Sequence, residues 1–126
     1  MKRLIPAVAV LGLLAGGAHA QSALMLEGVP RGEIVNTTYR CTGATTALKL
    51  PSSLVQVTYH NAGQNSLALV PFTDGVRVFV NVISGSGARY VAGDLEWWEK
   101  GGEVRLSSVR AEGSTGGPAA TCQEIR

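Results

Sequence analysis

The apolar residues after position 35 alternate with polar ones at a period of two. In Val76–Ile83 the four valines at 76, 78, 80 and 82 share one face, and Val55, Val57 and Tyr59 do the same in Leu54–His60. A period of two is typical of β-strands, and we expect the valine face to be thoroughly buried. The same pattern predicts shorter strands at Thr37–Cys41, Ser66–Pro71, Ala88–Ala92, Leu95–Glu99, Glu103–Val109 and Ala120–Ile125.

Turn-forming residues separate these eight segments, and none of the connections resembles a crossover helix. The turns include Asn61-Ala62-Gly63, Asp74-Gly75, Gly93-Asp94 and Gly101-Gly102. Short strands at close spacing indicate an antiparallel sheet. A small chain with this many strands would expose long edges unless the sheet closed on itself. The sequence therefore predicts an all-β fold, a small eight-stranded antiparallel barrel, with a β-sandwich as the alternative.

The first twenty residues predict an export signal. Lys2 and Arg3 precede an apolar stretch that is short for a membrane span, and Ala18-His19-Ala20 matches a signal-peptidase site. We therefore expect cleavage after Ala20 and a periplasmic protein. The segment begins like a lipoprotein signal, but Gly17 stands where the lipid-bearing cysteine would be, so we expect no membrane anchor.

Three segments are expected: the signal peptide at 1–20, a flexible leader or lightly packed first segment at 21–35, and the barrel domain at 36–126. Removal of Lys2 and Arg3 leaves nine of the 11 basic residues against nine acidic ones. This balance argues against a nucleic-acid partner.

Cys41 and Cys122 are the only cysteines. In an oxidising compartment they predict one disulfide, worth roughly 4 kcal/mol on the chain-entropy model; a zinc site would need further ligands nearby.

The segment Ser84-Gly85-Ser86-Gly87-Ala88-Arg89-Tyr90, followed by Trp98-Glu99-Lys100-Gly101, resembles the membrane-bound or periplasmic inhibitors of C-type lysozyme, the MliC/PliC family. The resemblance extends from Tyr39-Arg40-Cys41 through Val57–Asn61 to Cys122. It implies an eight-stranded barrel from which a serine loop and a lysine loop enter the active-site cleft of a host lysozyme. The expected lysozyme-binding residues are Ser86, Lys100, Gly85, Gly87, Ala88, Arg89, Tyr90 and Gly101.

These residue types suit such a target. C-type lysozyme cleaves peptidoglycan with two carboxyl groups through a positively charged transition state. The Lys100 ammonium can occupy the place of that charge, and the Ser86 hydroxyl can both donate to and accept from a carboxyl. Arg89 and Tyr90 are expected to brace the serine loop more than to touch the enzyme. Asp94, Glu96, Glu99 and Glu103 around Lys100 suggest an acidic collar that would attract a basic lysozyme.

Other interpretations stay open. Trp97 and Trp98 are adjacent, so one should face the core and the other outward, where it could stack on a sugar. The alternatives are therefore a small glycan- or ligand-binding periplasmic barrel and a structural envelope protein. His60 is expected at the rim beside a turn. No catalytic motif accompanies it, so we expect neither an enzyme nor a metal site nor a cofactor.

Overall fold

The computed structural model describes residues 27–108 and 117–126, and in this part of the chain every regular element is a β-strand. The strands are β1 (Glu33–Gly43), β2 (Leu54–Ala62), β3 (Asn65–Phe72), β4 (Gly75–Val82), β5 (Ala88–Ala92), β6 (Leu95–Lys100), β7 (Glu103–Ser108) and β8 (Ala119–Glu124). Each pairs antiparallel with its neighbour in sequence, and β8 pairs with β1 to close a barrel. The predicted barrel is confirmed, and the sandwich alternative is wrong.

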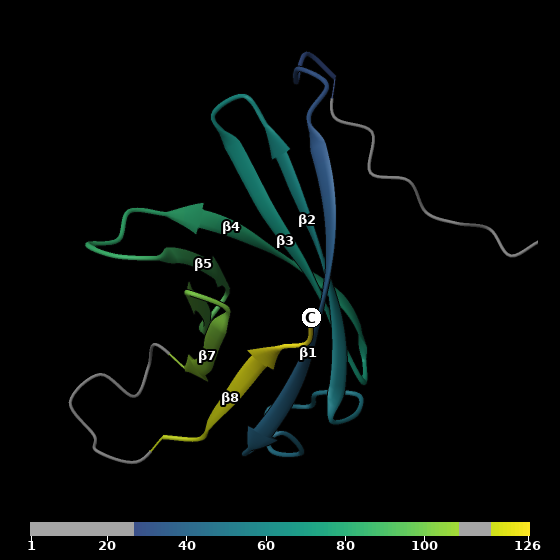
Figure 1. The fold of residues 1–126 in the computed structure, drawn as a ribbon, viewed down its shortest axis with the longest axis vertical. Helices are drawn as coiled ribbons and strands as arrows, with labels where there is room; N and C mark the ends of the chain where they lie inside the picture. Colours follow the sequence, from purple (N-terminus) through teal and green to yellow (C-terminus); the bar gives the residue numbers. More distant parts are fainter. Residues whose placement is uncertain (1–26, 109–116) are drawn as a thin grey trace, which may run out of the picture.

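Because successive strands alternate in direction, the connections fall at two ends of the barrel. One end carries the start of β1, the end of β8 and the connections β2–β3, β4–β5 and β6–β7; we call it the loop end. In Figure 1 the β2–β3 hairpin and the start of β1 rise together, while the β4–β5 connection projects to the left. The other end carries the β1–β2, β3–β4 and β5–β6 connections.

The barrel interior is filled by side chains that alternate along the strands. The largest fully buried ones are Trp97, Phe79, Leu106, Val55, Val57, Val70, Val104 and Cys122. Trp97 packs edge-on against Tyr39, with ring centroids 5.4 Å apart. Trp98, the next residue, lies on the outer face and is half-buried. The prediction that one tryptophan faces the core and the other faces outward is therefore confirmed.

Two tyrosines supply the polar contacts inside the barrel. The Tyr39 and Tyr59 hydroxyl oxygens lie 2.7 Å apart, and the Trp97 indole N–H donates to the Tyr59 oxygen at 2.9 Å. Burial raises the pKa of both phenols above their ordinary value. The two rings therefore stay neutral and hydrogen-bonded at physiological pH, which holds β6 against β1 and β2.

The predicted disulfide joins Cys41 on β1 to Cys122 on β8, 81 positions apart in sequence. The two cysteines are directly opposite partners in the register of these strands. Both are almost fully buried. The bond therefore lies where the first and last strands meet to close the barrel.

The buried face predicted for the strand at 76–83 is wrong. Val76, Val78 and Val80 face solvent, with exposed fractions of 62%, 42% and 51%, while Phe79 between them is fully buried. Alternation shows which residues share a face but not which face points inward. Here the inward face carries the Phe79 ring, which lies opposite the small Ala68 of β3 and stacks on Phe72 with centroids 6.1 Å apart.

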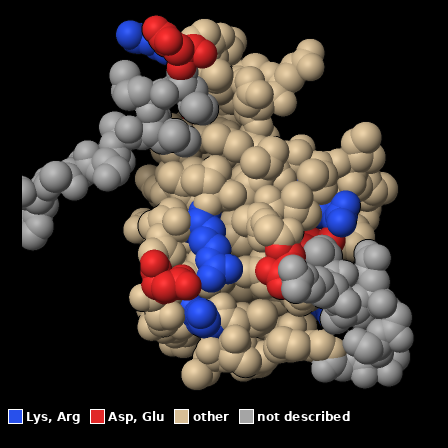
Figure 2. All heavy atoms as spheres, turned by 180° about the vertical axis from the view of Figure 1, so that it is seen from behind, with Lys and Arg blue, Asp and Glu red and all other residues tan. Residues whose placement is uncertain are grey.

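The first strand begins at Glu33, earlier than the predicted Thr37 and inside the segment expected to be a leader. The signal peptide, residues 21–26 and Val109 lie outside the described residues, so the expected division into three segments stays a prediction. Within residues 27–108 and 117–126 no helix is long and apolar enough to cross a bilayer. On the face shown in Figure 2, basic and acidic side chains lie beside one another, and neither sign forms a continuous patch.

Candidate functional site

The serine and lysine segments, 14 residues apart in sequence, meet at the loop end. A two-residue connection between β5 and β6 sets the register Ala92↔Leu95, and this register continues to Ala88↔Glu99. The residues before Ala88 therefore lie beside those that follow Glu99. Ser86 and Lys100 are consequently neighbours on one rim of the barrel, and both side chains are exposed.

The serine loop, defined as residues 83–87, is held by two hydrogen bonds to backbone oxygens. The Ser84 hydroxyl donates to the Gly87 carbonyl at 3.0 Å, which closes the loop on itself. The Trp98 indole N–H donates to the Ser86 carbonyl at 2.9 Å, which ties the loop to β6. Within the described residues the Ser86 hydroxyl itself has no hydrogen-bond partner. The loop is thus fixed through its backbone while its hydroxyl stays available.

Gly87 allows the serine loop to approach β6 closely. Its φ of 65° lies in the left-handed region. A Cβ at this position would collide with the Glu99 carbonyl oxygen and lie 2.6 Å from Lys100 Cγ. Gly85 differs, because its φ is not left-handed and no heavy atom lies within 4 Å of where its Cβ would be. Of the two glycines that flank Ser86, Gly87 is therefore the one that the local packing requires.

The lysine turn, defined as Lys100–Gly102, is a two-residue hairpin connection closed by the Lys100↔Glu103 pair. Gly101 and Gly102 have φ values of 58° and 86°, as a type I′ turn requires. The Gly102 N–H donates to the Glu99 carboxylate at 2.9 Å. The Gly102 carbonyl accepts from the Glu124 N–H at 2.8 Å. The turn is therefore held by β8 as well as by its own hairpin.

The Lys100 ammonium lies 4.0 Å from the centroid of the Trp98 ring, in a cation–π contact. Its neighbouring carboxylates have other partners. Glu99 accepts from Gly102, and Glu103 accepts from the Gln123 amide. Within the described residues, Lys100 consequently forms no ion pair, and its charge faces solvent at the rim.

The remaining residues predicted to bind lysozyme lie behind the serine loop. Tyr90 is 6% exposed and points into the barrel, where its hydroxyl lies 3.4 Å from that of Ser66. Ala88 is half-buried against the core. Arg89 points outward and is paired with Glu96. The structure therefore places Ala88 and Tyr90 as supports for the loop, and Arg89 in a contact within the barrel wall.

The acidic collar predicted around Lys100 is different in the structure. Asp94 precedes β6 at the far end of the barrel, roughly 20 Å from Lys100 along an extended strand. The Glu96 side chain is 14% exposed and is neutralised by Arg89. Glu99 and Glu103 do flank the lysine turn. Glu124, which no local sequence pattern predicts here, also lies near the turn: its carboxylate is 3.2 Å from where a Cβ on Gly102 would be.

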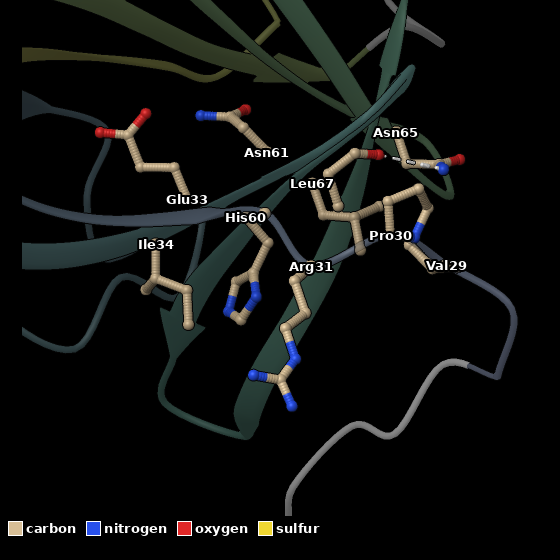
Figure 3. A pocket seen from close by; sticks show the side chains of 11 residues that line it. Val29, Pro30, Arg31, Glu33, Ile34, His60, Asn61, Asn65 and Leu67 are labelled. Carbon is tan, nitrogen blue, oxygen red and sulfur yellow. Dashed lines mark hydrogen bonds between the residues drawn. The ribbon is translucent and has the colours of Figure 1, made fainter.

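Two further hollows open near the loop end. One lies at the barrel mouth and is lined by Val35, Thr37, Tyr39, Tyr59, Asn61, Tyr90, Glu99 and Glu124. The other lies outside β1 and β2, where His60 and Arg31 point to the same side, with Ile34 and Pro30 nearby (Figure 3). His60 is thus near the rim, as predicted.

In the part of the chain that the structure describes, no cluster of histidine, cysteine and acidic side chains could hold a metal ion.

The contacts that Trp98 makes are not predicted by the sequence. The alternation predicts that one of the two tryptophans faces outward, where a sugar-stacking role is the only one that it suggests. A signal was present, because the two-residue turn Gly93-Asp94 fixes a register that brings residue 98 near the serine loop. Side-chain contacts with both Ser86 and Lys100 could not be derived from the register alone.

Comparison with known proteins agrees with the resemblance in the serine and lysine segments. The family "Membrane-bound lysozyme-inhibitor of c-type lysozyme" (MliC) matches residues 39–114. A membrane-bound lysozyme inhibitor of C-type lysozyme from Cupriavidus necator is 31% identical over 96% of this chain and 90% of its own length. One from Pseudomonas aeruginosa is 57% identical over 51 residues, which is 40% of each chain.

A solved structure gives the same result. The crystal structure of Pseudomonas aeruginosa MliC in complex with hen egg white lysozyme matches this chain with a TM-score of 0.61 at 35% sequence identity. The match covers 83% of this chain and 96% of that one. The fold and the sequence therefore point to the same family.

Proposed function

Because the chain belongs to the family of membrane-bound lysozyme inhibitors of C-type lysozyme, we propose that it inhibits C-type lysozyme by inserting the serine loop and the lysine turn into the active-site cleft. One observation carries this proposal. Within the described residues, Ser86 presents a hydroxyl without a hydrogen-bond partner beside the Lys100 ammonium, which has no ion pair, and the backbones of both segments are fixed. The solved complex of the relative with hen egg white lysozyme supports the choice of partner.

The chemistry of the target explains why these two groups suffice. Two carboxyl groups flank the bond that lysozyme cleaves, and positive charge develops on the sugar between them. The Lys100 ammonium would take the place of that charge and donate to a carboxylate. The Ser86 hydroxyl would bond the second carboxyl in either protonation state. Neither group contains a bond that the enzyme can cleave, so the cleft stays blocked.

The supports around the two groups favour tight binding. Free loops would lose conformational entropy when they entered a cleft, and that loss weakens association. Here the serine loop is bonded to β6 and the lysine turn to β8. Gly85, Gly87 and Gly101 present backbone without side chains beside the two functional groups. Ala88, Arg89 and Tyr90 would act behind the loop by holding its second half in place.

The direct test is lysis of a Gram-positive cell suspension by C-type lysozyme, with and without the purified protein. We expect lysis to stop at a small molar excess of the protein, while a lysozyme of another class stays active. The double variant Ser86→Ala/Lys100→Ala, checked for folding by its thermal transition, should no longer protect the cells. Full lysis by the C-type enzyme at a large excess of wild-type protein would reject the function.

We also propose that the protein is exported and acts in the periplasm without a lipid anchor. The support is the signal pattern of residues 1–20 and Gly17 at the position of a lipoprotein cysteine. Its named relatives are membrane-bound inhibitors, so the two modes can be compared directly. Osmotic-shock release of a protein starting at Gln21 would agree with the proposal, whereas recovery in the membrane fraction alone would contradict it.

A further inference from the structure

We propose that Trp98 is a positioning residue that joins the serine loop and the lysine turn into one binding unit. This inference rests on the proposed function and adds a role for a residue that need not touch the enzyme. Trp98 lies between the two functional groups on the outer face of β6. Its indole N–H donates to the backbone carbonyl of Ser86, and its ring contacts the ammonium of Lys100.

The hydrogen bond restrains the loop at its functional residue. The indole nitrogen of tryptophan can only donate, and here it donates to the carbonyl of Ser86 itself. Fixing that carbonyl fixes the plane of the peptide that follows Ser86. Together with the bond from Ser84 to the Gly87 carbonyl, it restrains the loop on both sides of the serine hydroxyl.

The ring restrains the lysine. A lysine side chain has four rotatable carbon–carbon bonds and loses much freedom when it is bound. The Trp98 ring, with Lys100 Nζ 4.0 Å from its centroid, attracts the ammonium without neutralising it. A carboxylate in the same place would also hold the lysine but would compete with the carboxyls of the target. An aromatic ring therefore positions this cation and leaves its charge available.

The frame around Trp98 is rigid enough to transmit these restraints. Its backbone is paired with Arg89 of β5 and Arg105 of β7. The preceding residue, Trp97, is fully buried and bonded to Tyr59. The close contact of Gly87 with β6 leaves little room for the loop to move toward the barrel. Both functional groups are thereby set at fixed positions relative to one strand.

Two variants separate the two contacts. Trp98→Phe removes the N–H and keeps a ring beneath Lys100, whereas Trp98→Leu removes both. Against hen egg white lysozyme, calorimetry should show a dissociation constant raised about threefold to tenfold for Trp98→Phe, the size expected for one lost hydrogen bond, and more for Trp98→Leu. Val78→Leu, on the outer face of β4, is the matched surface control and should bind as wild type.

Nuclear magnetic resonance of the free protein distinguishes positioning from direct contact. Trp98→Phe should increase the mobility of the amides at 84–87, while the upfield ring-current shift of the Lys100 ε-methylene protons persists. Trp98→Leu should abolish that shift as well. If both variants bind weakly while loop order and lysine shifts stay unchanged, Trp98 contacts the enzyme directly and positioning is wrong. If wild type fails to bind lysozyme, the proposed function fails, and the free-protein spectra still decide whether Trp98 orders the two segments.

Discussion

The two faces of β6 use the same residue type for different purposes. Trp97 points inward, is fully buried, and has its indole N–H bonded to Tyr59. Trp98 points outward, is half-buried, and has its N–H bonded to the backbone of the serine loop. On the inner face the polar groups bond one another. On the outer face the Trp98 N–H restrains the Ser86 backbone, and the Trp98 ring contacts the Lys100 ammonium. Within the described residues, the Ser86 hydroxyl has no hydrogen-bond partner and Lys100 forms no ion pair.

This contrast shows how a small barrel can combine a stable interior with a rim whose side chains stay available for binding. Buried polar groups stabilise a core only when they are satisfied, and the tyrosine contacts achieve that inside. A binding site needs the reverse, since a group already bonded to its own chain must lose that bond before it can bind a partner. Because side chains alternate between the two faces of a strand, β6 carries the satisfied interior tryptophan and the outward one at adjacent positions.

The largest expected effect comes from truncating each tryptophan in turn, which tests whether the inner one stabilises the fold and the outer one does not. Trp97→Ala should lower the free energy of unfolding by about 3–5 kcal/mol, as expected when a large buried ring is removed from a core. Trp98→Ala should lower it by less than about 1 kcal/mol. Urea denaturation followed by far-ultraviolet circular dichroism measures both. Equal losses for the two variants would show that the outer tryptophan is a structural residue like the inner one.

On the outer face, single substitutions of the two proposed binding groups should affect binding and leave stability nearly unchanged. Lys100→Ala should raise the dissociation constant for C-type lysozyme by roughly 30-fold to 1,000-fold, because a buried carboxyl pair would lose its cation. Ser86→Ala should cost about tenfold or less. Surface plasmon resonance checks both values.

The matched control is Lys49→Ala, which removes the same charge at the far end of the barrel, where Lys49 lies 3.8 Å from Asp74. The Lys100 and Ser86 effects should be less than additive if both groups engage one carboxyl pair. Wild-type affinity in both single variants would show that other residues of the loop end make the contact.

The last prediction concerns the inner face alone, where the two buried tyrosines should make the free energy of unfolding depend on pH. Because burial raises the pKa of Tyr39 and Tyr59 in the folded barrel, their contribution to stability is complete below the unfolded value of about 10 and declines as pH rises above it. Between pH 9 and 11 the free energy of unfolding should fall by about 1–3 kcal/mol, because each phenol with a strongly raised pKa contributes at most about 1.4 kcal/mol over this range. Tyr39→Phe should show a shallower decline in the same denaturation series. Identical slopes in the two proteins would contradict the assignment.

The sequence predicted where the strands lie, but it did not predict which face of each strand points into the barrel. The strand at Ala88–Ala92 matches its prediction at both ends, because turn residues bound it closely. The alternation also predicts the strand at 76–83, but it predicts the wrong face of that strand to be buried. β-Branched residues favour extended backbone on either side of a sheet, so four valines do not determine the inner face. The inner face is determined by the space beside the small Ala68, which Phe79 fills. Predicting this contact requires the register between β3 and β4.

For the candidate site, residue identities came from a family resemblance and their arrangement came from the structure. The pattern Ser-Gly-Ala-Arg-Tyr marked Ser86, and the lysine before Gly101 marked Lys100. Asp94 and Lys100 are close in sequence but lie at opposite ends of one strand, so local charge counting overestimated the collar. Glu124 approaches the lysine turn from β8, a contact between residues distant in sequence that no local pattern contains.

The disulfide between Cys41 and Cys122 has a mechanical consequence. The bond joins the two strands that complete the barrel, at directly opposite positions. Tension applied to the two ends of the chain would therefore pass through the sulfur–sulfur bond and leave residues 42–121 outside the load path. The serine loop and the lysine turn both lie within those residues. Pulling the termini apart should thus strip the outer parts of β1 and β8 first, which would release the Glu124 support of the lysine turn, while the strands between the two cysteines stay folded until the bond is reduced.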